Sequence, residues 1–236
     1  MTARSVVLSV LLGAHPAAAA TAGELLRLTA EFGLKDTTLR VALTRMVSAG
    51  DLIRSADGYR LSDRLLARQS RQDEALHPRV RHWRGDWTTV VITSVGEDAR
   101  SRAALRSALS HSRFAELREG VWLRPDNLDV ELSTEIRGRS RLLAARDAEP
   151  QELARRLWDL SGWASTGTDL LDAMTQADDV PGRFVVAAAM VRHLLTDPVL
   201  PAELLAPGWP GERLRDAYQS FAAELGERRY QPMEAR

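Results

Sequence analysis

The segment from residue 21 to residue 61 constrains the fold of this chain more than any other. It opens with Thr21-Ala22-Gly23-Glu24, a capping box in which the Thr21 hydroxyl bonds the third helical N–H and Glu24 reaches back to the N-cap amide. Gly33 ends the helix that this box begins, and Asp36 is a suitable N-cap for a second helix. We therefore expect two helices joined by a tight glycine turn before residue 50.

The second of these helices, over residues 37–49, has a clear amphipathic pattern. One stripe is apolar and is expected to face the core: Leu39, Ala42, Leu43, Met46 and Val47. The opposite face is expected to be exposed: Thr37, Thr38, Arg40, Val41, Thr44, Arg45 and Ser48. After Gly50, two strand-like runs flank Asp57-Gly58, a dipeptide typical of a hairpin turn. Helix, turn, helix and hairpin, in this order, predict a winged helix-turn-helix.

The first 20 residues have two interpretations. Apolar residues at helical spacing favour a first helix over residues 3–13; they are Val6, Val7, Val10 and Leu11. The same stretch, with Arg4 before it and Ala17–Ala20 after it, also resembles a secretory signal with a small-residue cleavage site. No apolar run approaches the roughly 18 residues that span a bilayer, and the chain has no cysteine, which favours a reducing compartment. We expect a cytoplasmic protein without membrane contact.

Charge is unevenly distributed along a chain whose net charge is zero. Residues 1–84 carry 13 basic and 8 acidic residues, a net charge of +5, whereas residues 85–236 carry 19 basic and 24 acidic residues, a net charge of −5. A basic N-terminal part on an acidic body is typical of a DNA-binding head attached to a regulatory body. The charge distribution therefore supports DNA as the partner of the winged helix.

The exposed face of the helix over residues 37–49 is the predicted DNA-reading surface. An α-helix fits the major groove of B-DNA, where arginine can bond guanine edges bidentately and a valine or threonine methyl can meet thymine. We assign Thr37, Thr38 and Arg40 to bases and Arg45 to phosphate, because the first residues of a recognition helix lie deepest. The predicted DNA-binding set is Thr37, Thr38, Arg40, Val41, Thr44, Arg45, and Arg54 and Arg60 of the hairpin. The alternative is a solvated face whose arginines pair with neighbouring carboxylates.

The rest of the chain predicts an α+β protein. A helix and connector over residues 62–86 are followed by strand, helix, strand, strand, helix and strand, which is the ferredoxin-like order; the expected ranges are 87–92, 97–110, 114–117, 120–123, 129–136 and 141–145. Helices follow from residue 149, over 150–160, 168–176, 184–195 and 212–225. We predict three domains: a winged helix with connector (1–84), a ferredoxin-like middle (85–148) and a helical C-terminal effector and dimerisation domain (149–236).

Motifs for catalysis are missing from the sequence. It contains no nucleophile elbow, zinc-protease helix, phosphate-binding loop or dinucleotide fingerprint. His77 and His82 share a connector without a carboxylate pattern that indicates a metal. We predict no enzyme, no metal and no cofactor. The alternatives are a metal-dependent nucleic-acid-processing enzyme, for which Asp86 alone flanks the first middle strand, and a protein-interaction module that uses the winged helix as a docking surface.

Aromatic and basic residues in the last third of the chain have two interpretations. Aromatic walls with a few cations would suit a small acidic organic effector, and the residues proposed for this site are Trp158, Trp163, Arg183, Arg192 and His193. The alternative is that the tryptophans are core residues of the helical packing.

Several segments together resemble one family. They are Asp36–Met46 with Gly50-Asp51-Leu52, Arg84–Trp87, Arg106–Phe114, Gly120–Pro125, Asp197–Leu205 and Gly208–Gly211, in the order of the chain. These segments resemble the phenylacetate-degradation repressors (PaaX-like). The resemblance implies a cytoplasmic homodimeric repressor that binds a palindromic DNA operator and is released by an aryl-acyl-CoA thioester such as phenylacetyl-CoA. The chain departs from the family at Ser112–Ala115, where the family usually has Gly-Phe-Gly, and in its short wing.

Overall fold

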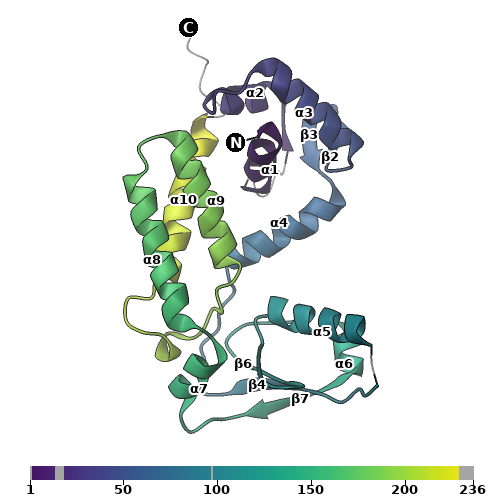
Figure 1. The fold of residues 1–236 in the computed structure, drawn as a ribbon, viewed down its shortest axis with the longest axis vertical. Helices are drawn as coiled ribbons and strands as arrows, with labels where there is room; N and C mark the ends of the chain where they lie inside the picture. Colours follow the sequence, from purple (N-terminus) through teal and green to yellow (C-terminus); the bar gives the residue numbers. More distant parts are fainter. Residues whose placement is uncertain (1, 14–18, 97, 229–236) are drawn as a thin grey trace. The chain divides into compact units, whose positions relative to one another are not determined.

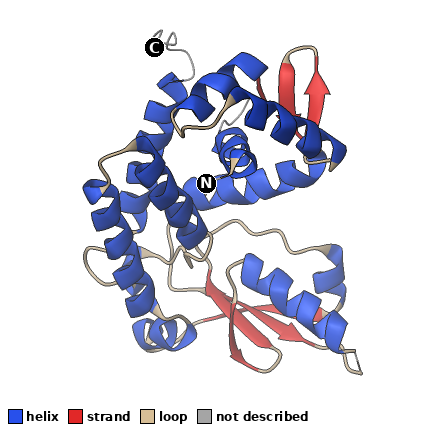
Figure 2. Ribbon diagram, turned by 45° about the horizontal axis from the view of Figure 1, so that its top comes forward, coloured by secondary structure: helices blue, strands red, loops and turns tan. Residues whose placement is uncertain are grey.

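A computed structural model describes residues 2–13, 19–96 and 98–228 (Figure 1). The fold is mixed α+β, with helices throughout and two antiparallel sheets, which confirms the predicted fold class (Figure 2). Its contacts group into two compact units. The first comprises Met1–His77, Thr166–Thr196 and Pro210–Arg236, and the second comprises Pro78–Ser165 and Asp197–Trp209. The division of the chain into three domains, with boundaries after residues 84 and 148, stays a prediction.

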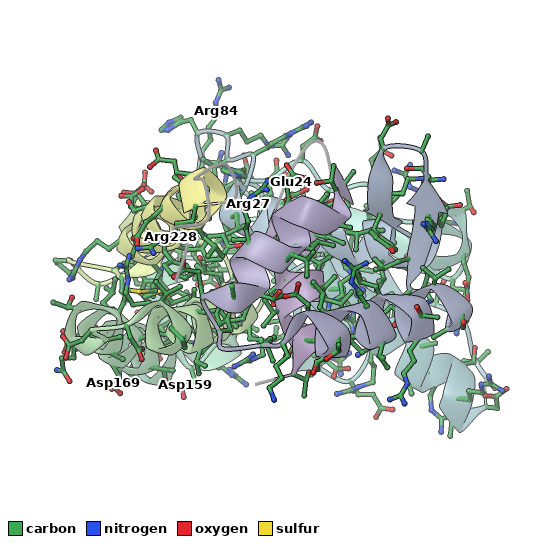
Figure 3. All side chains as sticks on the ribbon, turned by 90° about the horizontal axis from the view of Figure 1, so that it is seen from above. Glu24, Arg27, Arg84, Asp159, Asp169 and Arg228 are labelled. Atoms are coloured by element: carbon green, nitrogen blue, oxygen red, sulfur yellow. The ribbon has the colours of Figure 1, made fainter. Side chains whose placement is uncertain are left out.

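The winged helix-turn-helix predicted for the head is present in the first unit. Its elements are α1 (Ala3–Gly13), β1 (Ala19–Ala20), α2 (Ala22–Ala30), α3 (Asp36–Ser48), β2 (Leu52–Ser55), β3 (Gly58–Leu61) and α4 (Asp63–Leu76). The capping box holds as predicted: Thr21 Oγ1 accepts from Glu24 N, and the Glu24 carboxylate, labelled in Figure 3, accepts from Thr21 N. The α1 helix packs on α3, so this segment is part of the folded head.

Two details of the head differ from the predictions. Lys35, not Asp36, is the N-cap of α3, and it makes no side-chain cap bond. Gly58 lies in the strand rather than in the turn, since Ser55 pairs with Gly58. A side chain at Gly58, whose φ is +123°, would overlap the carbonyl oxygen of Ala20. Glycine is therefore needed there for the close approach of a neighbouring strand.

That neighbouring strand, β1, was not predicted. It pairs antiparallel with β3, so the sheet order is β1-β3-β2. The alanines at positions 17–20 were the predicted cleavage site of a secretory signal. Ala19 and Ala20 form β1 and pair with Arg60 and Tyr59, whereas residues 14–18 lie outside the described residues.

The core of the head is the predicted apolar stripe. Leu39, Leu43 and Met46 of α3 are fully buried, and Ala42 and Val47 are half-buried. They pack on the apolar residues of α1, of which Val6 and Leu11 are completely inaccessible. Burial of this kind stabilises a helix pair by roughly 25 cal/mol per Å² of apolar surface removed from water.

Tail helices complete the first unit, which includes α8 from Thr166 onward. α8 (Leu160–Gln176) begins eight residues earlier than the predicted helix, and α9 (Val180–Leu194) and α10 (Gly211–Arg228) follow it. α9 packs on α10 and α4, and α10 also contacts α2. Two hydrogen bonds join α10 to α4: in a buried one, Gln72 Nε2 lies 3.2 Å from Tyr218 Oη, and in a partly buried one, Arg215 Nε donates to Ala75 O at 3.0 Å. The tail therefore packs directly on helices of the winged-helix head.

The second unit has the predicted ferredoxin-like order. It runs β4 (Trp87–Ile92), α5 (Ala99–His111), β5 (Ala115–Arg118), β6 (Val121–Pro125), α6 (Thr134–Gly138) and β7 (Ser140–Ala145), and the antiparallel sheet has the order β5-β6-β4-β7. The predicted start of α5 at Glu97 lies outside the described residues. α6 is a short helix that begins five residues later than predicted. Ser133, rather than Asp129 or a neighbour, caps its N-terminus.

Both faces of this sheet are covered. α5 and α6 bury one face around Val90, Leu109 and Trp122. The other face packs Trp87 and Leu123 against α7 (Pro150–Leu157) and the short helix η1 (Ala202–Leu204), with Ala154, Leu200 and Leu204 buried. The segment Asp197–Leu205, singled out in the sequence, is thus a core component of the ferredoxin-like unit.

Candidate nucleic-acid interface

The outer face of α3 is exposed along its whole length. Every residue predicted to face solvent does so: Thr37, Thr38, Arg40, Val41, Thr44, Arg45 and Ser48. Val41 leaves 51% of its surface exposed, although it is β-branched and apolar. An exposed valine between threonines and arginines suits contact with the mixed polar and methyl edges of a DNA major groove.

The arginines of this surface have no internal partner among the described residues. Arg40 and Arg45 on α3, and Arg54 and Arg60 on the hairpin, form no ion pair with any described carboxylate. This disfavours the alternative that these arginines are paired on a merely solvated face. Their charges are available to phosphates or base edges.

One predicted residue has part of its hydrogen-bonding capacity used inside the helix. Thr44 Oγ1 donates to the carbonyl oxygen of Arg40 at 3.0 Å, the i−4 bond common for threonine in helices. Thr44 therefore presents its methyl group and an acceptor oxygen at the surface, but not its hydroxyl proton.

The hairpin does not bring its two arginines together. Arg54 is paired with Tyr59 and Arg60 with Ile53 across the two strands. Directly opposed residues share a face and successive residues alternate, so Arg54 and Arg60 point to opposite faces of the wing. Arg60 also pairs with Ala19 of β1. The two arginines consequently face different sides of the hairpin.

A groove of about 580 Å³ runs along α3. Thr37, Thr38, Val41 and Arg45 form one wall, and the start of α1 with the loop after α3 forms the other, through Thr2, Arg4 and Asp51. Four predicted DNA-binding residues thus share one concave surface. Arg4 and Asp51 were not among the predicted residues; the only sequence signal was the Gly50-Asp51-Leu52 motif, whose acidic residue had no assigned role.

The five proposed effector residues are divided between the two units. Trp158 stacks on Trp87 with ring centroids 6.4 Å apart, and Trp163 stacks on Trp209 at 4.6 Å, both in the second unit. These contacts agree with the alternative that the tryptophans are core residues. Arg183, Arg192 and His193 lie on α9 in the first unit.

Arg183 already has a counter-ion. Its guanidinium pairs with the Glu224 carboxylate and lies 5.2 Å from the Phe221 ring centroid. The hydrogen bond from Arg183, and a second from Arg228, hold the pKa of Glu224 below its ordinary value. Arg192, in contrast, is exposed and has no ion partner among the described residues.

The nuclease alternative is not favoured by the surroundings of Asp86. Arg146 Nε donates to Asp86 Oδ1 at 2.6 Å, and this bond lowers the pKa of the Asp86 carboxyl. No three histidine, aspartate or glutamate residues gather into a metal-binding group within the described part of the chain.

Models of three family domains match the chain in order. The PaaX-like protein model matches residues 2–65, the PaaX protein central Cas2-like domain matches residues 80–149, and the PaaX-like protein C-terminal domain matches residues 163–234. The chain belongs to the PaaX-like family. Members of the PaaX-like family are generally transcriptional regulators of phenylacetate catabolism, so the resemblance predicted from the sequence is confirmed.

A solved structure supports the same fold. An uncharacterized protein from Mycobacterium tuberculosis is 68% identical to this PaaX-like chain, with a TM-score of 0.87 over 97% of each chain. No curated protein matches the chain. None of the helices in the described ranges is long and apolar enough to cross a membrane.

Proposed function

We propose that this PaaX-like protein is a sequence-specific DNA-binding repressor, released from DNA by a small acidic effector such as an aryl-acyl-CoA thioester. The observation that carries the proposal is the outer face of α3. Its side chains are exposed from Thr37 to Ser48, and its two arginines have no ion partner among the described residues. Such a surface is suited to a polyanion with edges that donate, accept and present methyl groups.

In this proposal α3 enters the major groove. Thr37, Thr38 and Arg40 reach base edges, Arg45 binds a phosphate, and Val41 packs on a thymine methyl. Arg54 and Arg60 contact the backbone or the minor groove on opposite sides of the wing. A homodimer in the cytoplasm would place two such heads on a palindromic operator, with half-sites about one helical turn apart.

Release by effector would use the packing of the tail on the head. α9 contacts α4 and α10 contacts α2, so a ligand that favours one position of the tail helices also favours one position of the helices that support α3. The ligand must bind one arrangement more tightly than the other, because equal affinity shifts no equilibrium. Trp158, Trp163, Arg183, Arg192 and His193 remain the proposed effector residues. Arg192 is the strongest of them, since its charge is not neutralised by a described residue.

A binding titration tests the proposal. The full chain is titrated into labelled duplexes from upstream of its own gene and into scrambled duplexes of equal composition, over a range of salt. We expect tighter binding to the upstream duplex by at least two orders of magnitude, and weaker binding when phenylacetyl-CoA but not free CoA is added. Equal affinity for both duplexes at every salt concentration would overturn the proposal.

A further inference from the structure

A buried carboxylate beside α3 holds two exposed arginines. The side chain of Asp51 is 3% exposed, whereas those of Arg4 and Arg64 are 60% and 69% exposed. Arg4 donates from Nη2 to Asp51 Oδ2 at 2.9 Å and from Nε at 3.2 Å, and Arg64 Nη2 donates to the other oxygen, Oδ1. One carboxylate thus orients a guanidinium on each side of it.

The backbone of Asp51 is fixed as firmly as its side chain. Its N–H donates to Met46 O of α3 at 2.9 Å, and its carbonyl oxygen accepts from Ser62 N, just before α4, at 3.0 Å. The three charged residues come from three places in the head: the start of α1, the loop after α3, and the first turn of α4. The positions of the two arginines relative to α3 are therefore set by α1, α4 and the hydrogen-bonded Asp51.

The cluster keeps one net positive charge at the surface. Two guanidinium groups share one carboxylate, and the two guanidinium groups are exposed whereas the carboxylate is buried behind them. Three guanidinium nitrogens form no hydrogen bond with a described residue: Nη1 of Arg4, and Nε and Nη1 of Arg64. These donors, on guanidinium groups more than half exposed, are available to a ligand. Guanidinium groups held in one orientation suit phosphate oxygens, because less side-chain entropy is lost on binding.

The position of the cluster indicates which anion it meets. Arg4 and Asp51 line the groove whose other wall is Thr37, Thr38, Val41 and Arg45 of α3. A duplex that places its bases against α3 must bring its phosphate backbone past the edges of that groove. Arg4 is thus located where a backbone contact is required, and Arg64 is bound to the same carboxylate.

We infer that Arg4 and Arg64, held by Asp51, form a clamp for a backbone phosphate of double-stranded DNA. The inference rests on the proposed DNA-binding function and adds a binding site to it. Asp51 acts as a positioning residue, and the two arginines make the contact. The clamp carries no sequence information, so it applies to any duplex that the head binds.

The salt dependence of binding separates a phosphate contact from a structural role. Arg4→Gln, Arg64→Gln and the double variant are compared with wild type on both the upstream and the scrambled duplex, by fluorescence anisotropy between 50 and 200 mM salt. Arg213→Gln is the matched control, because Arg213 is an exposed α10 arginine for which the structure gives no ion pair. Thermal unfolding of each variant is measured in parallel.

We expect the double variant to lower the slope of log affinity against log salt by about 0.9, which is the value for one lost phosphate contact, and each single variant to lower it by part of that amount. The loss is equal on both duplexes, and the control leaves the slope unchanged. A lower unfolding temperature with an unchanged slope would mean that the arginines only fasten the helices, and would overturn the clamp.

Asp51→Asn gives an independent test of positioning. It removes a negative charge near DNA, which by itself strengthens binding, but asparagine offers one acceptor oxygen where two arginines need partners. We expect weaker binding; stronger binding would overturn the positioning role.

Failure of the clamp and failure of the proposed function remain distinguishable. Equal affinity for upstream and scrambled duplexes overturns sequence-specific regulation, whereas an unchanged slope overturns the clamp alone, and wild-type protein that binds neither duplex overturns both.

Discussion

The ring of Phe32, two residues after the end of α2, packs edge-on against the ring of Phe184 in α9, with centroids 4.9 Å apart and an interplanar angle of 69°. Arg228 of α10, labelled in Figure 3, adds an ion pair to Glu31 at 3.3 Å. The helix α2, which precedes α3, is therefore joined to two tail helices at one point. Gly33, with φ of +65°, turns the chain toward α3 directly after this contact. A shift of α9 would reach α3 through this turn.

Phe184→Ala tests how strongly the tail stabilises the head. Phe184 is 6% exposed, so its truncation removes apolar contacts and leaves a cavity against Phe32. We expect a loss of about 3 kcal/mol in the free energy of unfolding of the first unit. Urea denaturation followed by circular dichroism measures it. Val185→Ala, one residue away at a position 55% exposed, should change stability by less than about 0.5 kcal/mol; equal losses for both variants would contradict the packing role.

Arg40→Ala and Arg60→Ala should have different effects on DNA binding. Arg40 is assigned to a base, so its loss should cost about 1–3 kcal/mol on the preferred sequence and relax the choice at one position. Arg60 is assigned to the backbone or the minor groove and not to major-groove bases, so its loss should weaken binding to all duplexes about equally. Competition with single-base-substituted duplexes measures both effects. An unchanged sequence preference in Arg40→Ala would show the assignment to be wrong.

The Glu224 ion pairs predict a pH dependence of stability. Because the pKa of Glu224 is lowered in the folded state, chiefly by the hydrogen bond from Arg183, its contribution is present above the ordinary value of 4.5 and is lost as the pH falls through the lowered value. Since the partners are about one-third exposed, we expect no more than about 1 kcal/mol. The difference in unfolding temperature between wild type and Glu224→Gln should be present at pH 7 and vanish in strong acid. A difference independent of pH would contradict the ion-pair explanation.

Asn127→Ala tests the attachment of the Asp197–Leu205 segment to the ferredoxin-like unit. Asn127 is 2% exposed, and its Nδ2 donates to Val199 O at 2.9 Å. Val199 has φ of +51°, a conformation that a β-branched residue adopts only when its surroundings hold it there. Loss of the bond leaves a buried carbonyl unsatisfied, so we expect a loss of about 2 kcal/mol, measured by urea denaturation. Asp129→Ala, at an exposed position close by, is the control, and a similar loss there would contradict the prediction.

Local signals in the sequence predicted the elements that depend on local interactions. The strand Trp87–Ile92 and the capping box at Thr21 are confirmed, because the strand preference of a run of aromatic and β-branched residues and the bonds of a cap involve neighbouring residues only. The strand β1 was missed because two alanines have no strand preference of their own; they pair only because Gly58 leaves room for them. The start of α8 was missed because its first turns, around Gly162, carry weak helix-forming residues.

The candidate site was predictable only along a single helix. Helical spacing places the exposed residues of α3 on one face without further information. Arg4 and Arg64 could not be associated with it, since they meet through Asp51, 47 and 13 residues away in the chain. The proposed effector residues were grouped by sequence proximity, but the fold assigns the tryptophans and the α9 residues to different units and pairs Arg183 with Glu224.

Selection of binding sites by the full chain from a pool of random duplexes tests most directly whether α3 reads DNA sequence. The account predicts enrichment of a palindromic motif whose half-sites lie about 10 base pairs apart, with the enrichment lost in Arg40→Ala at one position of each half-site. A pool that stays random after repeated rounds, although the protein binds it, would contradict the central claim.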